Sequence, residues 1–244
     1  MARKLKIALV GNPNSGKSSV FNGLTGLNQK VANFPGVTVD KKMGFATLSD
    51  NEGNQIQAEY IDLPGTYSLY PKSPEEKLPF QILCDPSNES HPDLTIVVAD
   101  GTNLKRNLFL CSQVIDLKIP VILVINMMDL VRYKKIEIDF HRLSLRLGIP
   151  VIPMNARTHE GVKELKKAIV QPLHVPDNDF IDVRVFSPVV VDTIRNVVHV
   201  NSNYNAFLVA NNLDLITAFE IHQWKRDKIQ AACKDHFFDS QQMQ

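Results

Sequence analysis

The stretch that decides the fold is Gly11-Asn12-Pro13-Asn14-Ser15-Gly16-Lys17-Ser18, which has the pattern G-x-x-x-x-G-K-S. It follows an apolar, strand-like run at residues 7–10 and precedes a helix-like segment at residues 19–24. Glycines in such a loop let the backbone wrap closely around phosphate groups, and the positive end of the next helix faces the anion. The sequence therefore predicts a phosphate-binding loop; the alternative is an ordinary glycine turn between a strand and a helix.

Two side chains of this loop are expected to act directly on a nucleotide. Lys17 would place a positive charge at the β- and γ-phosphates, and Ser18 would offer its hydroxyl to Mg²⁺. The nucleotide is expected to contact the whole loop and the residue after it: Gly11, Asn12, Pro13, Asn14, Ser15, Gly16, Lys17, Ser18 and Ser19.

A second motif, Asp62-Leu63-Pro64-Gly65, closes a strand-like segment. Asp62 is expected to hold Mg²⁺ through a water molecule, and the Gly65 N–H is expected to contact the γ-phosphate and so detect its loss. Alone, the motif is only a turn at the end of a strand. Its position after a phosphate-binding loop favours the functional interpretation.

The motif Asn126-Met127-Met128-Asp129 follows a buried strand at residues 121–125 and predicts recognition of the base. The Asp129 carboxylate can accept hydrogen bonds from N1–H and the exocyclic amine of guanine, a pattern that adenine lacks, so the nucleotide is GTP or GDP. The alternative is that Asp129 caps a helix. After the last strand, Asn155-Ala156-Arg157 is expected to offer backbone N–H groups to the guanine oxygen.

The segment between the first helix and the hairpin is expected to cover the phosphates with Gly36, Val37, Thr38, Val39 and Asp40. The Thr38 hydroxyl would complete the Mg²⁺ shell, and its backbone would hold the γ-phosphate. The alternative is that Thr38 is a β-branched residue at the start of a strand. With Lys17 and Gly65, Thr38 is expected to act on the reacting phosphate.

Alternating strand-like and helix-like segments predict an α/β fold at residues 1–171. We expect a mainly parallel sheet of six to seven strands with one antiparallel hairpin strand and helices on both faces. The hairpin strands are predicted at 43–48 and 55–61, and residues 26–40 are predicted to be irregular. A helix should begin at Ser73-Pro74, with Pro79 kinking or shortening it. A small all-helical subdomain is predicted at 176–244.

The composition argues against a nucleic-acid-binding, a disulfide-stabilised or a membrane-spanning chain. The net charge of +1 gives no general attraction to nucleic acid or to anionic membranes, and the helical segment carries six Lys/Arg against nine Asp/Glu. Cys84, Cys111 and Cys233 are widely spaced, which indicates a reducing compartment. Apolar runs are much shorter than the roughly 20 residues of a membrane helix, so the chain as given is predicted to be soluble.

Together these motifs resemble the guanine-nucleotide-binding domain of P-loop GTPases. More narrowly, residues 4–171 resemble the cytosolic amino-terminal region of ferrous iron transport protein B (FeoB). That likeness rests on Gly11–Ser18, Asn33-Phe34-Pro35-Gly36-Val37-Thr38-Val39, Asp62-Leu63-Pro64-Gly65-Thr66-Tyr67-Ser68-Leu69 and Asn103-Leu104-Lys105-Arg106-Asn107-Leu108. Asp40, where the family usually has Glu, and Pro79 depart from its pattern, and the helical part matches poorly.

The resemblance implies a module of an Fe²⁺ transporter at the cytoplasmic face of the bacterial inner membrane, joined to a transmembrane permease region. It implies that the helical part slows nucleotide dissociation and that Asn14 binds K⁺ and takes part in catalysis, although Asn14 alternatively only shapes the loop. Thr66 follows Gly65 where Ras-type enzymes carry a water-orienting Gln, so slow hydrolysis is predicted. Self-association stays open. The competing hypotheses are an Era-like, RNA-associated GTPase and a GTP-dependent assembly module with negligible catalysis.

Overall fold

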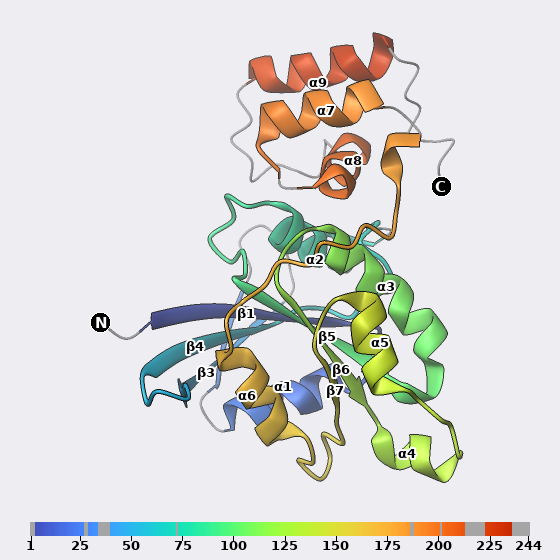
Figure 1. Cartoon of the computed structure of the whole chain (residues 1–244). Coiled ribbons are helices and arrows are strands. Elements are labelled where there is room, and N and C mark those ends of the chain that lie inside the picture. Colours follow the sequence, from blue (N-terminus) through green and yellow to red (C-terminus); the bar gives the residue numbers. More distant parts are fainter. Residues whose placement is uncertain are drawn as a thin grey trace.

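The computed structural model describes residues 3–26, 29–33, 40–71, 73–185, 188–200, 202–212 and 223–235. Within them, a seven-stranded sheet in the order β2-β3-β4-β1-β5-β6-β7 carries helices on both faces (Figure 1). The strands are β1 (Arg3–Gly11), β2 (Gln29–Asn33), β3 (Asp40–Ser49), β4 (Gln55–Asp62), β5 (Leu94–Asp100), β6 (Val121–Asn126) and β7 (Val151–Pro153).

The strand directions confirm the predicted sheet. β3 is antiparallel to both of its neighbours, β2 and β4, whereas the pairs β1–β4, β1–β5, β5–β6 and β6–β7 are parallel. The predicted hairpin turn is held by Asp50, whose N–H donates to the Asn54 carbonyl and whose carboxylate accepts the Asn54 N–H at 2.8 Å. A single antiparallel strand therefore joins an otherwise parallel sheet.

The prediction of an irregular segment at 26–40 is wrong for Gln29–Asn33, which forms β2. β2 pairs with the beginning of β3, from Gln29 opposite Gly44 to Asn33 opposite Asp40, so β3 also begins earlier than predicted. Val31 is 67 % exposed, and three of the five residues of the strand, Gln29, Lys30 and Asn33, are polar. A polar edge strand lacks the alternation that identifies a strand from sequence, because only its pairing with β3 stabilises it.

The helices that flank the sheet divide into two groups. α1 (Lys17–Thr25) and α6 (Val162–Val170) cover one face, and α2 (Pro74–Cys84), α3 (Leu104–Asp116), α4 (Met128–Tyr133) and α5 (Phe140–Leu147) lie on the other. β1 shows the division, since Ile7 and Leu9 face the first group while Ala8 and Val10 face the second. This alternation with period two buries both faces of the sheet.

α2 begins where the sequence predicts. The Ser73 hydroxyl accepts the Glu76 N–H, and Pro74 occupies the first turn. The helix continues past Pro79 to Cys84, so Pro79 does not shorten it, and the alternative of a kink stays a prediction. α4 was not predicted, because its residues were assigned to the base-recognition motif and the loop after it.

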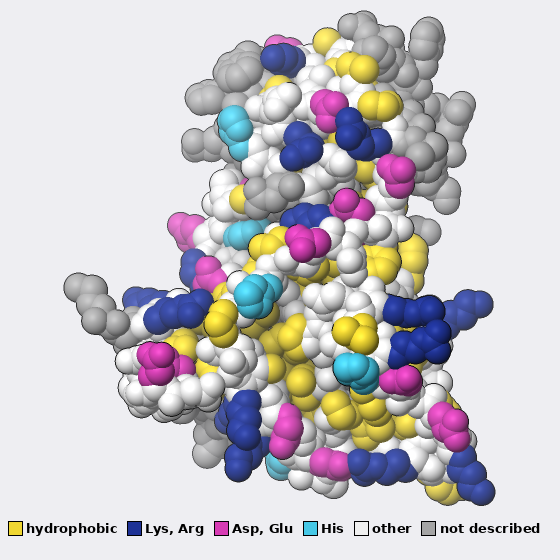
Figure 2. Space-filling model, in the orientation of Figure 1, with side chains coloured by type: hydrophobic (Ala, Val, Ile, Leu, Met, Phe, Trp, Pro, Cys, Tyr) yellow, Lys and Arg dark blue, Asp and Glu magenta, His cyan; other side chains and the backbone are white. Residues whose placement is uncertain are grey.

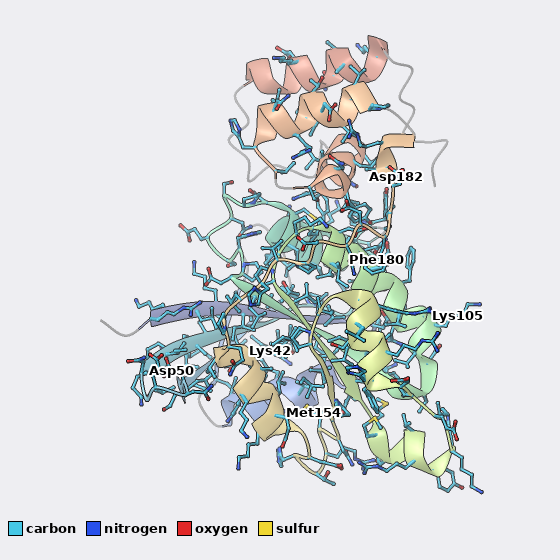
Figure 3. The ribbon with its side chains drawn as sticks, in the orientation of Figure 1. Lys42, Asp50, Lys105, Met154, Phe180 and Asp182 are labelled. Atoms are coloured by element: carbon cyan, nitrogen blue, oxygen red, sulfur yellow. The ribbon has the colours of Figure 1, made fainter. Side chains whose placement is uncertain are left out.

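Beyond the sheet, α7 (Pro188–Val198), α8 (Asn203–Asn211) and α9 (Gln223–Asp235) form a helical group that lies next to α2 and α3 (Figure 1). We call these three helices the appendage. The segment that carries Phe180 and Asp182 leads up to it (Figure 3). Figure 2 shows acidic and basic side chains interspersed on the visible face of the appendage. The boundary predicted between residues 171 and 176 stays a prediction.

Candidate nucleotide-binding site

The predicted motifs meet at the carboxyl ends of the parallel strands. Gly11 ends β1, Asp62 ends β4 and Asn126 ends β6, and β1 lies between β4 and β5 in the sheet. In open α/β sheets this edge is where ligands bind, at the strand where the order of the sheet reverses. The topology therefore brings together motifs that are more than a hundred residues apart.

Lys17, Ser18 and Asp62 form a cluster at the centre of this edge. The Lys17 ammonium pairs with one carboxylate oxygen of Asp62, and the Ser18 hydroxyl donates to the other at 3.1 Å. The side chains of Lys17 and Asp62 are only 10 % and 4 % exposed. A buried charge needs a partner, so this ion pair holds both groups in place until an anion or a cation competes for them.

A cavity of about 460 Å³ lies over this cluster. It is lined by Asn12, Pro13, Asn14, Gly16, Lys17, Ser18, Ser19, Gly65 and Glu75. The amide of Asn12 and the hydroxyl of Ser15 are buried in the same loop without hydrogen-bond partners among the described residues. Buried polar atoms without a protein partner are usually satisfied by a bound ligand or by ordered water.

Gly16 shows why the loop needs glycine. Its φ is +83°, and a Cβ atom there would lie 2.2 Å from Nδ2 of Asn126. The Asn126 amide, 4 % exposed, donates to the Ser15 carbonyl at 3.0 Å and accepts the Ala156 N–H at 3.0 Å. Asn126 thus joins the phosphate-binding loop to Asn155-Ala156-Arg157, as the predicted site requires.

Asp129 lies in the first turn of α4, half-buried, and it does not cap the helix. The residue at the N-cap is Met127, which has a left-handed φ of 63°. α4 is fixed to the next loop, because the Met128 N–H donates to the Met154 carbonyl at 3.3 Å and the Arg132 guanidinium pairs with Glu160. That hydrogen-bonded guanidinium holds the pKa of Glu160 below its usual value. Arg157 is exposed, and its N–H donates to the Asn155 side chain at 3.2 Å.

The Asp62-Leu63-Pro64-Gly65 turn is attached to β1 and to the phosphate-binding loop. The Leu63 N–H donates to the Leu9 carbonyl and the Thr66 N–H to the Gly11 carbonyl, both at 3.1 Å. A Cβ atom at Gly65 would lie 3.1 Å from the backbone of Pro13. Gly65 therefore lies against the loop, where its predicted contact with a phosphate group is possible.

Asn14 is exposed in the loop and has a left-handed φ of 65°. Asn adopts this conformation more readily than most residues with a side chain, so the backbone alone gives a reason for Asn at this position. The K⁺ role and the loop-shaping role of Asn14 both fit this geometry.

Of the predicted covering segment, Gly36, Val37, Thr38 and Val39 lie outside the described residues. Asp40 begins β3 and is paired with Asn33. Sequence reasoning missed Glu75 as a lining residue of the cavity. Its place in the first turn of a helix was visible in the sequence, but the approach of that turn to the phosphate-binding loop depends on how the chain packs.

Metal and membrane features can be stated for the part of the chain that the structure describes. There, no group of three or more His, Cys, Asp or Glu side chains is arranged to hold a metal ion. None of the helices in those ranges is long and apolar enough to cross a bilayer.

The sheet topology, the phosphate-binding loop and the Lys17–Ser18–Asp62 cluster define the fold of a P-loop GTPase domain. The family model described as "Ferrous iron transport protein B" matches residues 5–169. The chain belongs to this FeoB family.

Known relatives agree with this assignment. The chain is 44 % identical over 167 residues to the Fe(2+) transporter FeoB of Salmonella typhimurium and 45 % identical to that of Escherichia coli K12. Each match covers 68 % of this chain and 21 % of the relative, so the chain spans about a fifth of the relatives' length.

Solved structures match more of the chain. A GDP-bound S. thermophilus NFeoB mutant has a TM-score of 0.74 at 31 % identity, covering 99 % of this chain and 93 % of the other. The G domain of T. maritima FeoB is 41 % identical, with a TM-score of 0.60, and the match covers 69 % of this chain and 98 % of that one.

Proposed function

We propose that this chain binds GTP and GDP together with Mg²⁺ and hydrolyses GTP slowly, as the nucleotide-binding module of a ferrous iron transporter. The observation that carries the proposal is the cluster of Lys17, Ser18 and Asp62, with the Lys17–Asp62 ion pair buried beneath a cavity lined by the phosphate-binding loop. GDP bound to the S. thermophilus relative supports the choice of nucleotide.

In this proposal each group has a defined task. Lys17 leaves Asp62 and binds the β- and γ-phosphates, and loop N–H groups from Gly11 to Ser19 surround the phosphates. Ser18, Asp62 and Thr38 would hold Mg²⁺, since hydroxyl and carboxylate oxygens suit this ion, which neutralises phosphate charge when bound. Gly65 and Thr38 contact the γ-phosphate and change position when it is lost.

Base selection tests the proposal most directly. Hydrogen bonds to a charged acceptor are worth about 1.5–3 kcal/mol each, so removing the two expected at Asp129 lowers affinity about 10²–10⁴-fold. Asp129→Asn should lose GDP affinity by this factor and gain affinity for xanthosine diphosphate, measured by titration calorimetry. Glu137→Gln, an exposed change just beyond α4, should bind GDP as the natural chain does. Unchanged GDP affinity in Asp129→Asn would refute the assignment of the base site.

The prediction that GTP hydrolysis is slow rests on Thr66. Its hydroxyl is buried and donates to the Ser68 carbonyl at 2.6 Å, so it is not directed at a water molecule in the cavity. We expect turnover well below ~1 s⁻¹ in the absence of K⁺ and partner proteins, against ~10⁻⁴ s⁻¹ for unassisted Ras. A faster rate measured by phosphate release contradicts this part of the proposal.

Potassium dependence is tested separately. If Asn14 binds K⁺ beside the nucleotide, hydrolysis by the natural chain is faster in K⁺ than in Na⁺, and Asn14→Ala removes the difference. If Asn14 only shapes the loop, both salts give equal rates, and Asn14→Gly, which also adopts positive φ, retains nucleotide binding.

The transport role rests on the family and on the relatives named above. We infer that residues 1–171 form the GTPase domain, that residues 176–244 form a helical subdomain, and that the whole protein joins them to a membrane-embedded Fe²⁺ permease at the cytoplasmic face of the inner membrane. The reading frame beyond Gln244 should then encode several apolar segments of ~20 residues. A frame without such segments would contradict the transport role and leave the nucleotide site standing.

A further inference from the structure

Two exposed side chains outside the predicted motifs join the segments that are expected to hold the base. Arg132 lies in the last turn of α4, and Glu160 lies in the loop between β7 and α6. The Arg132 Nη1 atom donates to Glu160 Oε2 at 3.1 Å, and Nη2 donates to Oε1. A guanidinium that meets both oxygens of a carboxylate fixes the orientation of both groups. The ion pair therefore fixes how α4 lies against this loop.

The loop carries Asn155-Ala156-Arg157, and Glu160 is part of its backbone frame. We call residues 155–160 the base loop. The Asn155 N–H donates to the Glu160 carbonyl at 3.0 Å, and these two residues form a β-bridge across the loop. Within it, the Thr158 N–H donates to the Asn155 carbonyl at 3.2 Å. A movement of Glu160 is therefore transmitted to the N–H groups that are expected to contact the guanine oxygen.

The base loop is held differently on its different sides. At its start, the Asn126 side chain, which is 4 % exposed, accepts the Ala156 N–H at 3.0 Å. The loop also rests on α1, where a Cβ atom added to Gly23 would lie 3.3 Å from Nδ1 of His159. Toward α4, the end of the loop is held by the ion pair, whose side chains are 60 % and 48 % exposed. Water and salt can therefore reach the contact with α4 but not the contact at Asn126.

The exposure of the ion pair decides which property of the molecule it controls. Exposed ion pairs add little to the stability of a fold, because water and salt screen them. This pair, however, connects α4, which carries Asp129, to the loop that is expected to contact the same base. Breaking it leaves both segments folded and allows them to separate. The effect should therefore fall on how long a bound base is retained and not on folding.

We propose that Arg132 and Glu160 are positioning residues for the base site, and that their ion pair holds the base loop against α4 and slows the dissociation of guanine nucleotide. The inference rests on the proposed nucleotide-binding function and deepens it by naming residues that set how long the nucleotide stays bound. Salt, or a charged partner that competes for either side chain, speeds its release.

The dissociation of GDP that carries a fluorescent N-methylanthraniloyl group, followed by stopped flow after excess GDP is added, tests the proposal. At low salt, Arg132→Ala and Glu160→Ala should each raise the dissociation rate constant about two- to fivefold, the range expected for an exposed ion pair. The double variant should release GDP no faster than either single variant, because each loses the same pair. Exchanging the charges, in Arg132→Glu with Glu160→Arg, should restore slower release. The association rate constant should stay unchanged in all of them.

Salt gives a second measurement, made on the natural chain and the double variant. The difference between their dissociation rate constants should narrow at about 1 M NaCl, where the Debye length is about 3 Å. Asp192→Ala is the matched control, since Asp192 in α7 forms an exposed ion pair with Arg184 outside the nucleotide site. It should release GDP as the natural chain does at both salt concentrations.

Several outcomes overturn the inference: natural release rates in both single variants, additive acceleration in the double variant, an undiminished difference in high salt, or faster release in Asp192→Ala. A variant that folds poorly binds less of the fluorescent GDP, which lowers the amplitude and leaves the rate constant of the bound fraction unchanged. Loss of fold is thus distinguished from loss of positioning. A natural chain that does not bind GDP refutes the proposed function itself, which separates the two failures.

Discussion

At the scale of single residues, Asn126 joins two loops of the site that are far apart in the sequence. It holds the Ser15 carbonyl and the Ala156 N–H from a position at the end of β6, where it is 4 % exposed. Asn126→Ala leaves two buried backbone groups unpaired, so we expect the free energy of unfolding to fall by about 1–3 kcal/mol. Urea denaturation measures this loss, and guanine nucleotide affinity should fall with it.

The matched variant Asn126→Asp separates the two bonds. It keeps an oxygen to accept the Ala156 N–H and loses the donor to the Ser15 carbonyl, so the phosphate-binding loop is affected and the loop at Asn155 is not. We expect a loss of stability at least as large as that of Asn126→Ala, because the new carboxylate is buried and faces the Ser15 carbonyl oxygen. If Asn126→Ala unfolds at the same free energy as the natural chain, the Asn126 amide does not join the two loops.

Residue identities in the site were predictable wherever the chemistry is carried by a local pattern. Lys17, Ser18 and Asp62 were expected to converge on phosphate and Mg²⁺, and the structure brings them together. Glu75 was not predicted, because it reaches its place by the packing of a helix against a loop. No spacing in the sequence encodes such a contact.

At the scale of elements, α1 is held close to the sheet by the missing side chain of Gly44. A Cβ atom on Gly44 of β3 would lie 2.2 Å from Cγ2 of Thr25, the last residue of α1. Gly44→Ala should therefore push α1 away from β3 and lower the free energy of unfolding by about 1–3 kcal/mol, the usual cost of overpacking. Thermal or urea unfolding gives the value.

Thr25→Ser supplies the control, since it removes Cγ2 and keeps the hydroxyl that donates to the Phe21 carbonyl at 2.8 Å. The double variant Gly44→Ala with Thr25→Ser should be more stable than Gly44→Ala alone. Additive losses would show that the contact between α1 and β3 is not what Gly44 protects.

The end of α3 holds the segment that leads to the appendage. Asp116, 1 % exposed, accepts the Phe180 N–H at 2.9 Å and the Ile181 N–H at 2.7 Å. Burial raises the pKa of Asp116, although these bonds oppose the rise. The folded chain therefore keeps this proton to a higher pH than the unfolded chain does, and stability falls as pH rises from about 3.8, the usual value, through the raised pKa.

Asp116→Asn cannot titrate, so it should remove this part of the pH dependence. The free energy of unfolding of the natural chain, minus that of Asp116→Asn, should decrease from pH 4 to pH 7 in urea titrations. Asp182→Asn changes an exposed carboxylate in the same segment and serves as the control. A difference that grows with pH would mean that burial does not dominate at Asp116.

A helix or strand was predictable where its own sequence pattern stabilises it, and less so where contacts with distant segments do. The buried strand β6 and the capped helix α2 carry their own patterns, and each was predicted within a residue of its observed start. β2 and α4 carry no such pattern. β2 exists because β3 pairs with it, and α4 because Met128 and Arg132 attach it to the loop at 154–160.

At the scale of the whole molecule, one apolar core includes side chains from both the sheet and the appendage. Val97, Leu123, Val191 and Leu208 belong to the same cluster of buried residues. The connecting segment is also fixed, because the Lys118 ammonium donates to the Asn178 carbonyl at 2.6 Å and pairs with Asp179 at 2.8 Å. A shared core and a fixed connection predict that the two parts unfold together.

The chain's single tryptophan makes this testable, since Trp224 lies in α9 and the predicted nucleotide site lies at the sheet. GDP at 100 times its dissociation constant adds about 2.7 kcal/mol to the state that binds it. If the molecule unfolds as one unit, GDP raises the urea midpoint of Trp224 fluorescence as much as that of far-UV circular dichroism. If the appendage unfolds independently, GDP leaves the Trp224 transition in place while the sheet transition moves. Lys118→Ala removes the Lys118 contacts of the connecting segment and keeps the shared core, so both probes should still shift together at lower midpoints.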